Sequence, residues 1–244
     1  MKRSLFLLSF FLLSSLCAEK IGLLVMATYK YTHFIPPLIE SARKHFCKNH
    51  EVTFFVFTDG EIPQSDDIVQ IYQPRLGWPF DTMMRFEVYA KHSDLLASQD
   101  YLYACDADML FVDTVSDEIL GERVATLHPG FVGMRGSYER NPLSLAYTSA
   151  DEGKFYFCGG FLGGKTEELL KMAKTVSERI QDDLTRGVIA EWHDEAHWNR
   201  YCIDHEPTLI LTPSYCYPEE LSLNYHKRLL ALCKKHKDWQ QPLE

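Results

Sequence analysis

Two carboxylates, Asp106 and Asp108, interrupt the otherwise apolar stretch YLYACDADMLFVD. A lone charge is seldom buried, so either a strand ends here and the acids face solvent, or a positive group lies against them. On an extended strand, side chains at i and i+2 point to the same side, where two carboxylates repel each other unless a cation joins them. Oxygen ligands favour Mg²⁺ or Mn²⁺, and so few protein ligands would leave positions open for diphosphate oxygens. The triplet predicts such a metal site or a solvated strand end.

A second cluster of reactive side chains lies in EWHDEAHWN, residues 191–199. His193 and His197 stand at i and i+4, which can ligate zinc on one helix face, but the residues between them do not match His-Glu-x-x-His. A polar helix N-terminus, where acids are favoured, is the simpler interpretation. Trp192 and Trp198 beside carboxylates suggest a third interpretation, a sugar site with aromatic walls and a few polar groups.

Glycines are concentrated in CGGFLGG, residues 158–164. A glycine-rich phosphate loop usually opens a helix, whereas these glycines flank Phe161 and Leu162. Close approach of the backbone to a bulky ligand and a bulged strand are the two other interpretations.

The elements that would position these side chains alternate in the first half of the chain. Continuous apolar runs predict buried strands, and apolar residues at helical spacing predict helices. The predicted strands are residues 21–27, 51–60, 67–73 and 100–113, and the predicted helices begin near Pro36 and cover residues 81–98. This alternation implies parallel strands with helices on both faces, and ligands then bind beyond the carboxyl ends of the strands. Asp106 and Asp108 fall at or just past such an end.

The second half is expected to hold glycine-rich and aromatic strands and loops, followed by two helices. Residues 165–187 form a long amphipathic pattern that Thr166 would cap and Gly187 would end. Another helix is expected within residues 188–205, with titratable side chains crowded into its first turn. No repeat or low-complexity linker is visible, so residues 19–244 are expected to form a single domain.

Composition narrows the possible partners. The 244 residues are 46% hydrophobic and 24% charged, which is ordinary for a globular protein. The net charge of -9 is spread along the chain and argues against nucleic acid, although a local cation can still bind phosphate. None of the 7 cysteines forms a CxxC pair, so a zinc ribbon is not expected, and most cysteines are expected to be reduced and buried.

The N-terminus carries a targeting pattern. Lys2 and Arg3 precede a short apolar run, and small residues follow at Cys17 and Ala18. The run is shorter than the roughly 20 residues of a spanning helix. Residues 1–18 are therefore expected to be a cleaved signal peptide or a short signal anchor. Either places the protein in the secretory pathway or in association with a membrane.

Several long motifs follow one another between Thr126 and Tyr215. They read TLHPGF, SYERNPLSLAY, DEGKFYFCGGFLGG, VIAEWHDEAHWNRY and PTLILTPSY. Together with DYLYACDADMLFVD, WPFDTMMRFE and VFTD upstream, they resemble the retaining glycosyltransferases of family 6, the family of the histo-blood-group A and B transferases and α-1,3-galactosyltransferase. The resemblance implies a GT-A fold, a Rossmann-like α/β domain whose mixed sheet binds a nucleotide sugar and has helices on both faces.

The resemblance also implies an activity and its partners. GalNAc or Gal would pass from UDP-GalNAc or UDP-Gal to the 3-hydroxyl of a galactose-terminated glycan, with retention and an α-1,3 linkage. The expected cofactor is Mn²⁺ or another divalent cation. Asp106 and Asp108 would bind that metal and the UDP diphosphate.

Individual roles follow from the same matching motifs. Glu195 corresponds to the catalytic carboxylate beneath the anomeric carbon, where it would act as a nucleophile or stabilise a cationic transition state. The other residues that the resemblance assigns to the donor are Ala27, Thr28, Tyr31, Arg85, Ala107, Cys158, Gly159, Gly160, Asp194 and Lys235. Those that it assigns to the acceptor are His128, Trp192 and His193.

Four positions bear on specificity. Gly160 matches the glycine of the A-type transferases rather than the alanine of the B-type, and the space left by the missing methyl favours UDP-GalNAc. Cys158 stands where the blood-group enzymes carry Leu or Met. Where relatives carry Trp-Asp for acceptor recognition, this chain has Tyr217 and Pro218, which argues against a fucosylated acceptor.

Two other functions are alternatives to a transferase. A non-catalytic carbohydrate-binding protein on the same fold predicts the loss of Glu195 or of the metal acids, all of which are present. A UDP-sugar hydrolase would need further acidic ligands near Asp106 and Asp108 and a base that activates water. Its sign would be UDP release without an acceptor.

Overall fold

The computed structural model describes residues 18–233 of the chain. The predicted leader, residues 1–18, lies outside the described residues except for Ala18, and so does Lys235. The strands are β1 Lys20–Met26, β2 Glu51–Thr58, β3 Ile68–Tyr72, β4 Tyr101–Asp106, β5 Met109–Phe111, β6 Arg123–Leu127, β7 Phe157–Lys165, β8 Leu209–Leu211, β9 Tyr217–Pro218 and β10 Leu229–Ala231. The α-helices are α1 Ile35–His45, α2 Phe80–Met83, α3 Arg85–Lys91, α4 Ser93–Leu96, α5 Thr166–Thr185 and α6 His193–Asp204.

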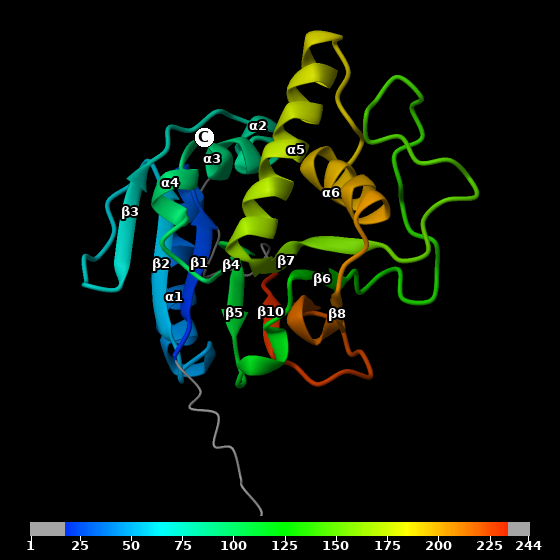
Figure 1. Ribbon diagram of the computed structural model, residues 1–244. Coiled ribbons are helices and arrows are strands. Elements are labelled where there is room, and N and C mark those ends of the chain that lie inside the picture. The colour runs from blue at the N-terminus through cyan, green and yellow to red at the C-terminus, as the bar shows by residue number, and fades with distance from the viewer. Residues whose placement is uncertain (1–17, 234–244) are drawn as a thin grey trace, which may run out of the picture.

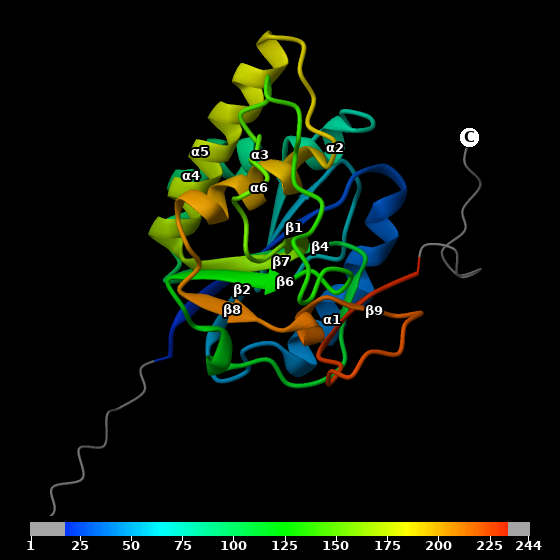
Figure 2. The same ribbon diagram turned by 90° about the vertical axis from the view of Figure 1, so that its right-hand side faces the viewer.

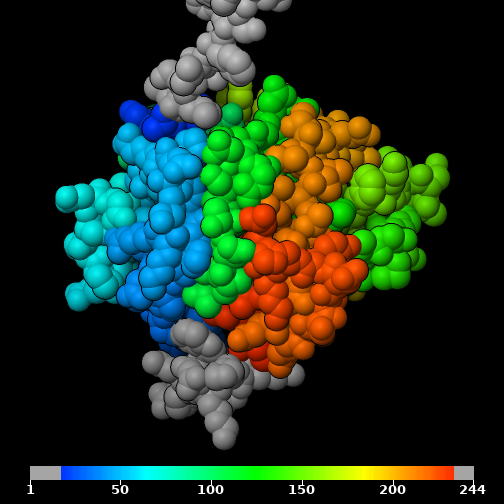
Figure 3. All heavy atoms as spheres, turned by 90° about the horizontal axis from the view of Figure 1, so that it is seen from below, coloured from blue at the N-terminus to red at the C-terminus, as the bar shows by residue number. Residues whose placement is uncertain are grey.

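A 7-stranded sheet organises the chain, in the order β3-β2-β1-β4-β7-β6-β8. β3, β2, β1 and β4 run parallel to one another, as the alternating pattern predicted. β7 is antiparallel to β4 and to β6, so the sheet is mixed. A small sheet, β5-β10-β9, brings the C-terminal segment against β5, and Figure 3 shows these orange-red residues beside green ones. The predicted α/β class with a mixed sheet is confirmed.

Helices cover both faces of the large sheet. Figures 1 and 2 show α3, α5 and α6 on one face, and α1 lies on the other. Because side chains alternate across a strand, β1 contributes to both cores. Its Leu23 and Val25 join the core that contains Leu38 of α1, whereas its Leu24 joins the core that contains Val176 of α5. The sheet is therefore buried on both faces, and its ends remain available for a site.

The strand predicted at residues 100–113 is wrong in its second half. β4 ends at Asp106, Ala107 and Asp108 form a turn, and β5 begins at Met109 in the other sheet. Parallel pairing between β4 and β1 stops at Asp106, opposite Met26, so the chain leaves the sheet at that point. The two carboxylates therefore lie at a strand end and in a turn, not at i and i+2 of one strand.

The single helix predicted over residues 81–98 is also wrong. The segment forms α2, α3 and α4, because the backbone at Met84 (ψ 4°) and His92 (ψ 19°) departs from helical geometry. Of the apolar positions predicted for it, Met83 and Phe86 are buried in the core shared with α5, whereas Ala90 is only partly buried and Leu95 is exposed.

The predictions for α5 are confirmed at one end only. Its N-cap is Lys165, and the buried Thr166 hydroxyl finds no hydrogen-bond partner among the described residues, so Thr166 is not the cap. Gly187 follows the helix with a φ of 69°, a left-handed conformation that glycine adopts at little cost.

The cysteines of the described residues are free, and all but Cys233 are buried, in agreement with the prediction. Burial raises the pKa of the Cys47 and Cys105 thiols, which keeps them protonated. Within residues 18–233, no helix has the length and apolar character needed to cross a membrane.

Candidate active site

A cavity of about 390 Å³ opens where β1 and β4 end. Thr28, Tyr31 and the Asp106–Asp108 turn line it, as expected for a ligand site at the carboxyl ends of parallel strands. Ala27, also predicted for the donor, is buried beneath these residues and is not on the wall.

Arg85 is the positive group that lies against the strand-end acids. It begins α3, is only 6% exposed, and donates from Nη1 to Asp106 Oδ1 at 2.9 Å. Its Nη2 lies 2.5 Å from Asp194 Oδ2 of α6. Burial disfavours the guanidinium cation, but the carboxylates of Asp194 and Asp106 raise the pKa of Arg85 above its usual value, so it stays charged. Arg85 thus joins the end of β4 to the start of α6.

Two acids begin α6 beside Arg85. Asp194 is buried, and burial raises its pKa to about 6 despite the Arg85 pair. Burial also raises the pKa of Glu195 to about 7, against the lowering effect of the Gly159 N–H, which donates to Glu195 Oε2 at 2.8 Å. A buried carboxylate with a pKa close to neutral is typical of a catalytic group.

The glycine-rich stretch forms strand β7, with a register shift in its pairing with β6, so the bulged-strand interpretation is confirmed. The glycines also permit close approach, because a Cβ on Gly159 would lie 2.5 Å from Arg85 Nη2. A Cβ on Gly160 would lie 3.2 Å from Cys216 Sγ and 3.5 Å from Asp106 Oδ2. The predicted donor residues Cys158, Gly159 and Gly160 therefore adjoin the catalytic candidates.

Asn199 holds α6 against β7, a role that sequence reasoning missed. Its Oδ1 accepts from the Phe157 N–H at 2.8 Å, and its Nδ2 donates to the Phe157 and Glu195 carbonyls at 2.8 and 2.9 Å. The buried Asn199 amide thus supplies hydrogen-bond partners to the Phe157 N–H and C=O at the start of β7, and it orients the first turn of α6. No spacing signal marks it, because its partner is far along the chain.

The predicted acceptor residues lie beside a group of aromatic rings. His128 packs against Phe131 and Tyr156, with ring centroids 4.9 and 5.7 Å apart, and burial lowers the pKa of His128. Trp192 is 47% exposed, and its indole N–H donates to Ser137 Oγ at 2.9 Å. A half-exposed, oriented ring of this kind suits stacking on a sugar face.

The two histidines considered for zinc face different partners. His193 lies edge-on to Trp78 at 5.0 Å, whereas His197 is buried with Nε2 3.4 Å from Asp183 Oδ2. They therefore do not form one ligand pair. Within residues 18–233, no group of three or more His, Cys, Asp or Glu side chains could enclose a metal.

Asp106 and Asp108 fit a different kind of metal site. The Asp106 side chain is 46% exposed, and Arg85 bonds only its Oδ1, while Asp108 lies on the same cavity wall. Two carboxylates beside an open cavity suit a hard cation that completes its shell with water and phosphate oxygens. The residues present are thus compatible with Mn²⁺ or Mg²⁺ shared with a diphosphate.

The cavity also includes residues that sequence reasoning did not single out. Lys30 and Arg75 place cations on its wall, and the Arg75 guanidinium lies 4.1 Å from the centre of the Tyr29 ring. Asp81 braces the wall by accepting from the Leu76 N–H at 2.7 Å. Lys30 lies in a 3-10 helix, Arg75 in a loop and Asp81 in α2. The remaining lining residues are Met26, Trp78 and Thr82.

Comparison with known proteins gives one family and several similar relatives. The model of Glycosyltransferase family 6 matches residues 12–242. Histo-blood group ABO system transferase 1 of Rattus norvegicus is 37% identical over 88% of this chain and 67% of its own length. Histo-blood group ABO system transferase 2 of the same species is 36% identical over 88% and 70%. Globoside alpha-1,3-N-acetylgalactosaminyltransferase 1 of Homo sapiens is 32% identical over 82% and 61%.

Proposed function

The chain belongs to glycosyltransferase family 6 and is a glycosyltransferase. From this premise we propose that it moves GalNAc, or Gal, from a UDP-sugar to the 3-hydroxyl of a galactoside, with retention and an α-1,3 linkage. The observation that carries the proposal is the convergence of Arg85, Asp106, Asp194 and Glu195 beside one cavity at the strand ends.

The cavity suits the UDP half of the donor. Thr28 and Tyr31 would contact uridine, and Lys30 and Arg75 would balance phosphate charge on a chain that is negative overall. Asp106 and Asp108 would hold Mn²⁺ or another divalent cation together with the diphosphate. When bound, that cation supplies positive charge that stabilises UDP as a leaving group.

Glu195 is proposed as the carboxylate beneath the anomeric carbon. In the transfer, the bond from the anomeric carbon to the UDP oxygen breaks, and a bond to the acceptor 3-oxygen forms. The acceptor proton passes to the leaving phosphate. Glu195 either attacks the carbon first or stabilises the oxocarbenium-like transition state, and both routes need its ionised form. Asp194, fixed by Arg85 at 2.5 Å, would hold hydroxyls of the donor sugar.

The surroundings of Gly160 support GalNAc as the donor sugar. An alanine methyl there would enter space bounded by Cys216 and Asp106. The name of one relative also specifies an N-acetylgalactosaminyl transfer. Tyr217 is buried, and its hydroxyl accepts from the Leu223 N–H at 2.5 Å, so it offers no polar group to a fucose. We therefore favour an unfucosylated galactoside as acceptor, contacted by His128, Trp192 and His193.

The test is UDP release by the purified full-length protein. UDP-GalNAc and UDP-Gal are offered separately, with Mn²⁺ or EDTA, and with or without a β-galactoside. The proposal expects release that depends on the acceptor, is abolished by EDTA and is faster with UDP-GalNAc. Release independent of acceptor would instead indicate a hydrolase. Tight UDP binding without release would indicate a carbohydrate-binding protein.

We also propose that residues 1–18 direct residues 19–244, one catalytic domain, into the secretory pathway or to a membrane. The proposal rests on the basic and apolar pattern of that segment. N-terminal sequencing of the protein recovered from its host would test cleavage. Partition of a variant lacking residues 1–18 would test membrane association.

A further inference from the structure

Residues 128–156 link β6 to β7 without forming a helix or strand. The segment nevertheless carries His128, Ser137 and Tyr156, which border the proposed acceptor side. A segment without regular structure needs other contacts to hold one conformation, because ordering each residue costs conformational entropy. Two buried carboxylates supply these contacts.

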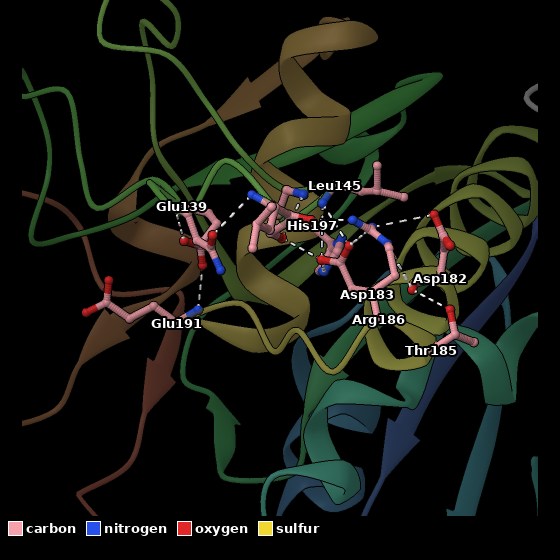
Figure 4. Close-up of polar contacts among 12 residues, drawn as sticks. Glu139, Leu145, Asp182, Asp183, Thr185, Arg186, Glu191 and His197 are labelled. Carbon is pink, nitrogen blue, oxygen red and sulfur yellow. Dashed lines mark hydrogen bonds and ion pairs between the residues drawn. The ribbon is translucent and has the colours of Figure 1, made fainter.

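Asp183 is the first of these carboxylates and is 1% exposed near the end of α5. Its Oδ2 accepts from Ser144 Oγ at 2.5 Å, and its Oδ1 accepts from the Leu145 N–H at 2.9 Å. Arg186 Nη2 lies 2.5 Å from Oδ1, and His197 Nε2 of α6 lies 3.4 Å from Oδ2. Figure 4 shows Asp183 with Leu145, Arg186 and His197 around it. One carboxylate therefore connects the segment, α5 and α6.

Glu139 is the second carboxylate and is 5% exposed. It accepts from the Asn141 N–H at 2.7 Å within the segment and from the Glu191 N–H at 2.6 Å just before Trp192 (Figure 4). Trp192 in turn donates to Ser137 of the segment at 2.9 Å. The segment is thus tied to Glu191 and Trp192, just before α6, and through Asp183 to His197, so contacts lie on both sides of Asp194 and Glu195.

The charges of His197, Arg186 and Asp183 are consistent with a stable network. Burial lowers the pKa of His197 to about 4, against the raising effect of Asp183, so the imidazole is neutral at physiological pH. Arg186 then supplies the positive charge that the buried Asp183 carboxylate needs. Asp183 touches none of the cavity residues, so its effect on the reaction must pass through the segment and α6.

We propose that Asp183 is a positioning residue that holds residues 137–148 against α6 and so preorders the acceptor side. The inference rests on the proposed transferase function. Preordering removes an entropy cost from acceptor binding and aligns the acceptor over the donor. Loss of Asp183 therefore weakens acceptor use while donor binding in the separate cavity persists.

The test compares Asp183→Asn and Ser144→Ala with Asp182→Asn in the full-length protein. Asp182 is the adjacent acid, its side chain is 55% exposed, and it contacts the same Arg186 at 3.5 Å, so it is a matched control. We expect the acceptor KM to rise about tenfold or more in Asp183→Asn and less in Ser144→Ala, with donor KM and Mn²⁺–UDP binding near wild type. Asp182→Asn should match wild type throughout.

Hydrogen exchange on the same proteins tests positioning without any turnover. Amides of residues 137–148 should exchange faster in Asp183→Asn and Ser144→Ala, while β1 and β4 stay protected. Unchanged exchange in this segment, or donor and acceptor KM raised equally in Ser144→Ala, would overturn the proposal. If wild type transfers to no acceptor, the transferase proposal fails, and the exchange result still decides whether Asp183 orders the segment.

Discussion

The two sides of the candidate site are built in different ways. The proposed donor side stands at the ends of β1 and β4, and parallel backbone pairing from Ile21↔Tyr101 to Met26↔Asp106 sets its shape. The proposed acceptor side consists of the start of α6 and residues 128–156, which the buried carboxylates Asp183 and Glu139 hold in place. The comparison shows that one site can be built in two ways: backbone hydrogen bonds between strands shape one half, and side-chain hydrogen bonds and ion pairs hold the other.

Arg85 is where the halves meet, because its guanidinium contacts Asp106 of the donor side and Asp194 of α6. Glu195 lies next along α6 and is bonded to the β7 backbone. Substitution of Arg85 should therefore affect both halves, whereas substitutions farther out should affect one.

Glu195→Gln should produce the largest loss. It keeps the shape but removes the charge that both proposed routes need, so transfer should fall about a thousandfold or more. UDP binding, measured by calorimetry with Mn²⁺, should persist. Glu178→Gln on the exposed surface of α5 is the control. Transfer within tenfold of wild type would remove Glu195 from the chemistry.

Arg85→Met tests the junction itself. It leaves Asp106 and the buried Asp194 without their cation, which should lower the free energy of unfolding by about 3 kcal/mol or more. Urea unfolding measures the loss. Arg43→Met, which breaks a more exposed pair with Asp67, should cost about 1 kcal/mol or less. Equal losses in the two variants would contradict a buried junction.

Asp106→Asn should damage the donor side selectively. Transfer should fall about a hundredfold, donor KM should rise, and the remaining activity should respond little to EDTA. Asp113→Asn supplies a control, since this carboxylate lies beyond β5 and bonds to His226 rather than to the cavity. If Asp106→Asn raised only the KM for the acceptor and left the KM for the donor unchanged, Asp106 would belong to the acceptor side instead.

Gly160→Ala should shift donor choice rather than destroy activity. The added methyl, 3.2 Å from Cys216 Sγ, should move the ratio of kcat/KM from UDP-GalNAc towards UDP-Gal by about tenfold. Cys216→Ala in the same background should relieve the crowding. A ratio unchanged in both variants would place the acetamido group elsewhere.

Acidification should produce the smallest effect. Burial raises the pKa of Glu195 to about 7, and both proposed routes use its ionised form, so activity should be present above this pH and be lost as the pH falls through it. Between pH 7 and pH 6 the ionised fraction, and with it kcat/KM, should fall about fivefold. A profile flat down to pH 5 would mean that Glu195 titrates at its ordinary value.

Local pattern predicted much of this molecule. Apolar runs located β1 and β2, helical spacing located α1 and α5, and the alternation predicted the parallel half of the sheet. The acids were predicted at or just past a strand end, and β4 does end at Asp106, although the strand itself was predicted to run on to Asp113. The breaks at Met84 and His92 were missed, since helical spacing of apolar residues persists through them.

The sequence by itself determined the α/β class, the family and the types of residue available for chemistry, because periodicity and motifs are local properties. Only the tertiary structure decided which charges meet. Arg85 reaches Asp106 across 21 positions, Gly159 reaches Glu195 across 36, and Ser144 reaches Asp183 across 39. A buried charge or polar group is costly unless it has a hydrogen-bond partner. Only the folded chain brings partners so distant in sequence within hydrogen-bond distance, so the sequence alone does not show which ones pair.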